Sequence, residues 1–69
     1  MNNDLIRKIL VYMRESGANI TPLKTRDIAD AMNMDIYRAR YYLYKLQFLA
    51  FVESDGTGKG RSIRWRLIR

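Results

Sequence analysis

A break of only two residues, Asn33 and Met34, separates two segments whose patterns predict helices. Asparagine tolerates the left-handed backbone region that so short a turn requires. Asp35 follows the break and is a good N-cap, so the second helix is expected from about Ile36 to Gln47 or Phe48. Two helices joined by so tight a turn predict a helix-turn-helix corner.

Spacing predicts which faces of these two helices are buried. In the first, Thr25 is the expected N-cap of the segment "RDIADAM". Its buried edge is predicted to consist of Ile28, Ala31 and Met32. In the second, three residues at helical spacing form the expected core line, namely Ala39, Leu43 and Leu46.

The rest of the chain supplies one helix before the corner and a hairpin after it. An amphipathic stripe predicts a helix over residues 4–16, which Gly17 ends, and Pro22 forces the next segment to be extended. Ile20 and Leu23 are expected to anchor this connector, which leaves room for one short edge strand. After the second helix of the corner, residues 51–54 predict a strand, "DGTGKG" a turn, and residues 63–68 an alternating strand with one apolar face.

These elements predict an α+β fold, mainly α, of the winged helix-turn-helix type. Its parts are three helices and a C-terminal two- or three-stranded β-hairpin wing. With 69 residues, the chain is expected to form a single domain over residues 1–69. The wing itself is placed at residues 55–62.

Composition argues against an enzyme. The chain has no cysteine and no histidine, which removes thiolate and imidazole chemistry and zinc sites. Asp27 and Asp30 lie three residues apart without further acids nearby, so capping or solvation explains them better than a metal does. We predict no enzymatic activity, no cofactor and no metal.

The first ten residues resemble neither a signal peptide nor a membrane span, which predicts a cytoplasmic protein.

The net charge of +6 is concentrated in one half of the chain. Residues 1–34 carry five basic and four acidic side chains, whereas residues 35–69 carry eight basic and three acidic ones. A basic surface attracts polyanions, and nucleic acid is the commonest of these.

The segment "YRARYYLYK" combines this charge with four tyrosines. At about 100° per residue, Tyr37, Tyr41 and Tyr44 fall opposite the core line and face solvent, whereas Tyr42 is expected to be half-buried. Arginine and tyrosine side chains can contact phosphates, guanine edges and thymine methyl groups. The predicted DNA-binding residues are Ile36, Tyr37, Arg38, Arg40 and Tyr41 in the major groove, Tyr44 and Lys45 nearer the backbone, and Lys59 and Arg61 in the wing.

Simpler explanations exist for some of these side chains. The tyrosines could be ordinary surface residues or pack against the wing. Arg64 and Arg66 are as well explained by solvation of the hairpin as by phosphate contact. Trp65 alternates with Ile63 and Leu67, so it is expected in the core rather than in a binding site.

The run "YRARYYL", followed by Leu46, Phe51 and Val52, resembles the PapI/FaeA-like regulators of bacterial fimbrial operons over nearly the whole chain. The resemblance implies a small winged-helix protein that binds GATC-containing regulatory DNA together with the leucine-responsive regulatory protein. It maps the recognition helix onto residues 37–42, with Arg40 and Tyr41 as the best matches. Ala50 stands where the family usually has a glycine before the hairpin.

Three functions remain open at this stage. The first is a DNA-binding regulator of either sign, expected to be a monomer alone and weak without a larger DNA-binding partner, because one such module buries only about 600–1,000 Å² on DNA. The second is a protein-interaction module that docks a partner through the three exposed tyrosines. The third is an RNA-binding domain that uses the same basic surface.

Overall fold

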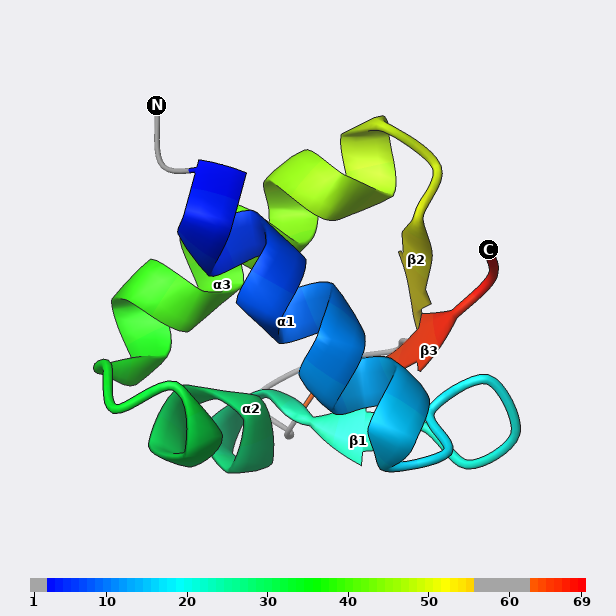
Figure 1. The fold of residues 1–69 in the computed structure, drawn as a ribbon, viewed down its shortest axis with the longest axis horizontal. Coiled ribbons are helices and arrows are strands. Elements are labelled where there is room, and N and C mark those ends of the chain that lie inside the picture. The colour runs from blue at the N-terminus through cyan, green and yellow to red at the C-terminus, as the bar shows by residue number, and fades with distance from the viewer. Residues whose placement is uncertain (1–2, 56–62) are drawn as a thin grey trace.

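The computed structural model describes residues 3–55 and 63–69, which form three helices and a small antiparallel sheet. Figure 1 shows α1 (Asn3–Glu15) crossing in front of α3 (Ile36–Phe48), with α2 (Thr25–Ala31) below them and the sheet to one side. The strands are β1 (Leu23–Lys24), β2 (Val52–Ser54) and β3 (Arg64–Leu67), in the order β1-β3-β2. The architecture confirms the predicted α+β winged-helix fold.

The core lies between the helices and the inner face of the sheet. Every element except the short β1 contributes a fully or almost fully buried side chain, and Leu23 of β1 packs against the cluster. Its buried members are Ile9, Met13, Ala18, Ile28, Leu43, Leu46, Val52, Trp65 and Leu67. The predicted core line of α3 is confirmed, since Ala39, Leu43 and Leu46 are all inaccessible to solvent.

The first connector differs from its prediction at one anchor. Gly17 ends α1 with φ 76°, as expected of a residue without a Cβ. Ile20, however, is 79% exposed and anchors nothing. Ala18 takes that role instead, because its side chain is buried and its carbonyl accepts a hydrogen bond from the Leu67 N–H at 3.0 Å. The predicted short edge strand is present as β1, which pairs with β3.

The start of α2 is also different. The N-cap is Lys24, whose side chain forms no capping hydrogen bond, and Thr25 is the first helical residue. The Thr25 hydroxyl is turned into the core, where it donates to the Ile63 carbonyl at 3.0 Å and accepts from the Trp65 indole Nε1–H at 2.7 Å. The N-cap prediction was therefore wrong, because two partners from the other end of the chain occupy that hydroxyl.

The corner between α2 and α3 is built as its sequence predicts. Asn33 has φ 56°, and Asp35 accepts a hydrogen bond from the Arg38 backbone N–H at 2.8 Å. The predicted buried edge of α2 was wrong at one position. Ala31 is exposed, and Ala29 is buried in its place. Met32 is half-buried at the end of this helix.

A second tight turn joins α3 to the sheet. Ala50 has φ 65°, a left-handed conformation that favours glycine, and the Phe51 N–H donates to the Leu46 carbonyl at 2.9 Å. The Gln47 side chain then accepts from the Ser54 N–H at 2.8 Å, which ties the last turn of α3 to β2. In β3, Trp65 and Leu67 are buried while Arg64 and Arg66 are exposed, as the alternation predicts.

Candidate nucleic-acid interface

The outer face of α3 carries three exposed tyrosines, which we call the tyrosine ridge: Tyr37, Tyr41 and Tyr44. Their exposed fractions are 75%, 60% and 44%. Tyr42 is half-buried, which confirms its predicted position between this ridge and the core. The helix thus presents aromatic rings to solvent along its length while its opposite face is buried in the core.

Cations lie against the tyrosine rings of α3. The Lys45 Nζ lies 5.8 Å from the centre of the Tyr41 ring, and the Arg40 Cζ lies 5.9 Å from that of Tyr37. The Arg38 Cζ lies 6.0 Å from the Tyr42 ring. Such contacts restrict flexible side chains to the helix surface, so the charges of α3 are partly ordered before any ligand arrives.

Arg38 is exposed and Lys45 is half-buried; Arg40, which is also half-buried, differs from both in the surroundings of its Nε. Its Nε is inaccessible to solvent and has no hydrogen-bond acceptor among the residues that the structure describes. A buried donor without an acceptor is costly. The side chain therefore gains a hydrogen bond if it turns toward an incoming acceptor such as a phosphate or a guanine edge.

Two of the predicted DNA-binding residues also take part in the packing of the domain. The Tyr44 ring meets the Trp65 ring edge to face, with centroids 5.2 Å apart and an interplanar angle of 83°. Tyr44 thus links α3 to β3 and remains 44% exposed. Ile36 is half-buried at the start of α3, directly after the capping residue Asp35.

The sheet contributes fewer available charges than its sequence suggests. Arg66 is paired with Glu53, its partner in the β2–β3 register, and this hydrogen bond together with the charge of Glu53 raises the pKa of Arg66. Arg64 is exposed and has no ion pair within residues 3–55 and 63–69. Lys59 and Arg61 lie outside the described residues, as does the wing beyond Asp55.

Two further findings concern sites of other kinds. Over the residues that the structure places, no three histidine, cysteine or acidic side chains come together in a way that could hold a metal ion. None of the described helices has the length and apolar character needed to cross a membrane.

Sequence reasoning missed one surface feature altogether. A hollow lies between α1 and the end of α2, and five of its six lining residues belong to α1. The available signal was Val11 and Tyr12, two apolar side chains that fall outside the predicted amphipathic stripe of α1.

Comparison with known proteins places the chain in one family. A family model described as "FaeA-like protein" matches residues 4–69, which is almost the entire sequence. The match is to the family and does not distinguish among its members. No curated protein matches the chain.

Proposed function

Because the chain belongs to the FaeA-like family, we propose that it is a DNA-binding regulator of a fimbrial operon. The observation that carries the proposal is the tyrosine ridge, with cations ordered against its rings on the helix that follows the tight turn. A helix in that position is the one that enters the major groove in helix-turn-helix proteins. The protein would act in the cytoplasm, at the nucleoid when bound to DNA.

The chemistry of α3 suits both parts of a DNA contact. Arg38 and Arg40 carry the planar donor groups that pair with guanine O6 and N7 or with phosphate. Tyr37 and Tyr41 offer rings for thymine methyl groups and hydroxyls for phosphates, and Ile36 would pack on a base edge. Tyr44 and Lys45 lie further along α3 and are assigned to the backbone. Lys59 and Arg61 are assigned to phosphates on the wing side.

A domain of this size binds DNA weakly alone, which favours action beside a larger DNA-bound protein. The family suggests the leucine-responsive regulatory protein as this partner and GATC-containing duplexes as the target. Both assignments are part of the proposal.

The test is an amide NMR titration with a short GATC-containing duplex and with an unrelated duplex, both at low salt. We expect shifts over residues 35–45 and in the wing, larger for the GATC duplex. If four to six phosphates are neutralised, the logarithm of the affinity should fall with the logarithm of salt at a slope of roughly −4 to −5. A slope near zero would remove the electrostatic basis of the proposal.

A matched pair of variants separates a specific contact from general charge. Arg40→Ala should weaken binding by about 5- to 100-fold, the range expected for loss of a bidentate base contact. Arg7→Ala removes the same charge from α1, outside the proposed interface, and should have a much smaller effect. Equal losses for the two variants would indicate non-specific attraction.

The exposure of Tyr37 and Tyr41 also favours a second candidate, a protein interface centred on the tyrosine ridge. Tyr41→Ala with unchanged DNA affinity and lost partner binding would favour that function. An excess of duplex RNA as competitor tests the third candidate, because an RNA-binding domain would release the DNA.

A further inference from the structure

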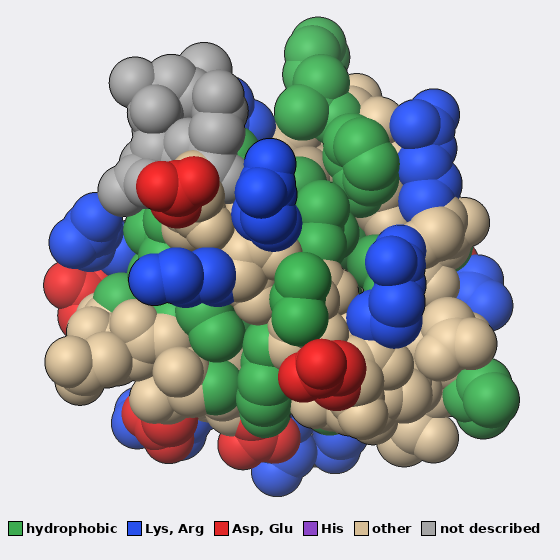
Figure 2. All heavy atoms as spheres, viewed as in Figure 1, with side chains coloured by type: hydrophobic (Ala, Val, Ile, Leu, Met, Phe, Trp, Pro, Cys, Tyr) green, Lys and Arg blue, Asp and Glu red, His purple; other side chains and the backbone are tan. Residues whose placement is uncertain are grey.

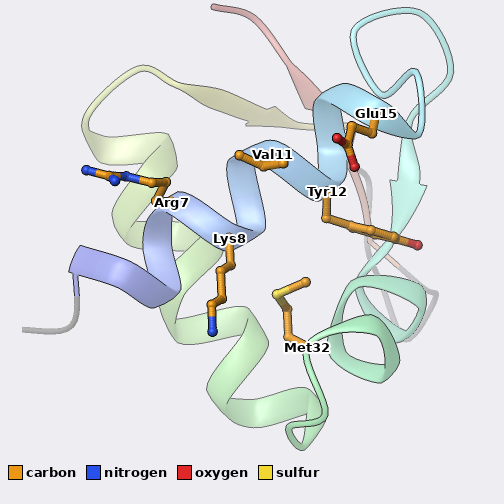
Figure 3. Close-up of a pocket in the computed structure, with 6 residues that line it drawn as sticks. All are labelled: Arg7, Lys8, Val11, Tyr12, Glu15 and Met32. Atoms are coloured by element: carbon orange, nitrogen blue, oxygen red, sulfur yellow. The ribbon is translucent and has the colours of Figure 1, made fainter.

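The hollow between α1 and the end of α2 has a volume of about 330 Å³ and is open to solvent. That volume is at the small end of the range for ligand pockets, about 300–1,000 Å³. Figure 3 shows Lys8 and Tyr12 of α1 and Met32 at the end of α2 framing the hollow. Its lining residues are Arg7, Lys8, Val11, Tyr12, Glu15 and Met32.

Its apolar side chains differ in their role in folding, since Tyr12 and Met32 pack against the core cluster, whereas Val11 does not belong to it. The core face of α1 carries Ile9 and Met13, which are fully buried. Val11 lies between them in sequence, points away from the core and is 45% exposed, while Tyr12 and Met32 are half-buried. Apolar groups that remain open to water on a second face of a helix are typical of a surface that a partner covers.

The charges around the hollow indicate what kind of partner this is. Arg7 and Lys8 are exposed at one end, and neither forms an ion pair in the described part of the chain. Glu15 is the single acid among the lining residues. Figure 2 shows this face, where a band of hydrophobic side chains crosses α1 with lysine and arginine side chains on both sides of it.

This face is turned away from the tyrosine ridge. The buried residues of α1 and of α3 both face the core, so Val11 on α1 and Tyr41 on α3 point outward from opposite sides of it. Figure 1 shows the same relation, with α1 in front of α3. A ligand on one face therefore leaves the other accessible.

We infer that the hollow is a docking site for an acidic amphipathic helix of a partner protein. One large apolar side chain of that helix enters between Tyr12 and Met32, and flanking carboxylates pair with Arg7 and Lys8. A second copy of this chain fits poorly, because it carries a net charge of +6 and would bring cations against the same cations. The inference does not depend on the DNA-binding proposal.

The experiment uses a designed probe on the full chain. The probe is an amphipathic peptide of about 16 residues, enough for four helical turns, with leucines on one face and glutamates beside them. A control peptide has lysine at every glutamate position. In amide NMR titrations we expect the acidic peptide alone to shift residues 7–15 and 28–34.

Four variants make the result specific. Val11→Asp should weaken the acidic peptide about tenfold, since it removes an apolar contact and adds repulsion. Val11→Ala should weaken it about threefold and keeps a good helix former, in case the first variant fails to fold. Lys8→Glu should weaken it at least threefold and improve binding of the lysine peptide, whereas Arg26→Glu, on an exposed cation that does not line the hollow, should change little.

Several outcomes would overturn the inference. Equal losses for Lys8→Glu and Arg26→Glu would show that only net charge attracts the peptide. Shifts centred on the tyrosine ridge would place the peptide elsewhere, and no shifts at millimolar peptide would exclude this class of partner. Displacement of the peptide by duplex DNA would assign the rim cations to nucleic acid.

Discussion

Among the polar side chains of the domain, Thr25 should be the one whose substitution lowers the free energy of unfolding most, and Thr25→Val tests this. Thr25 is 3% exposed, and its hydroxyl is the acceptor for the indole N–H of Trp65, a residue with no exposed surface. Valine has the same shape but offers no acceptor. The Ile63 carbonyl loses one of its donors but keeps the Thr25 backbone N–H at 3.1 Å, so most of the cost falls on Trp65.

The size of the effect follows from these contacts. A buried donor without a partner costs about 1–3 kcal/mol, and the weaker loss at Ile63 brings the expected total to about 2–3 kcal/mol. At about 0.05–0.15 kcal/mol per residue, a chain of this length has a total stability of only about 4–10 kcal/mol. Since each kcal/mol changes the melting temperature of so small a domain by about 4–8 °C, Tm should fall by about 10–20 °C.

The assay is urea unfolding followed by the emission of Trp65, the single tryptophan of the chain. Thr25→Ser keeps the hydroxyl and should retain more than half of the lost stability. Thr21→Val, at an exposed threonine, controls for the chemical change and should stay within about 0.5 kcal/mol of the parent. A Thr25→Val protein equally close to the parent, with Trp65 still buried, would refute the reasoning.

Three further changes test the turns and the sheet. Asp35→Ala should lower the free energy of unfolding by about 1 kcal/mol through loss of the N-cap of α3, and an Asp35→Asn variant that was equally unstable would argue against capping. Ala50→Gly should raise the free energy of unfolding by up to about 1 kcal/mol, because the strain of alanine in the left-handed region costs more than the entropy that glycine adds to the unfolded chain. A clearly lower free energy of unfolding in urea would contradict this. Glu53→Gln should leave the urea midpoint nearly unchanged but free Arg66, so DNA affinity should rise and its salt dependence should steepen by about one unit; unchanged DNA affinity would place Arg66 outside the interface.

The elements that sequence predicted best are those fixed by local chemistry. The bounds of α3, its cap at Asp35 and the left-handed turn at Asn33 all depend on residues within a few positions of one another. The exposure of Tyr37 and Tyr41 follows from the same helical phase that buries Leu43. Each of these features depends on neighbouring residues alone and can therefore be predicted without knowledge of the tertiary structure.

The errors occurred where distant contacts decide. Threonine is a common N-cap residue, but the partners of the Thr25 hydroxyl lie about forty positions away, at Trp65 in β3 and at Ile63 just before it. In the short helix α2, so few residues set the phase that Ala29 and Ala31 could not be distinguished. Ile20 is exposed, and the buried side chain of this connector belongs to Ala18 instead. The hollow beside Val11 arises only when α1 and α2 are packed together.

The strand order has a consequence for synthesis of the protein in the cell. β3, the last strand to leave the ribosome, is the central strand of the sheet, so β1 and β2 have no partner until it appears. It also delivers Trp65 and Leu67 to the core. The helix-turn-helix segment is thus fully synthesised before the strand that stabilises it has been made. A nascent chain stalled before β3 should therefore be sensitive to proteases. Truncation at that point would remove the whole domain rather than its wing alone.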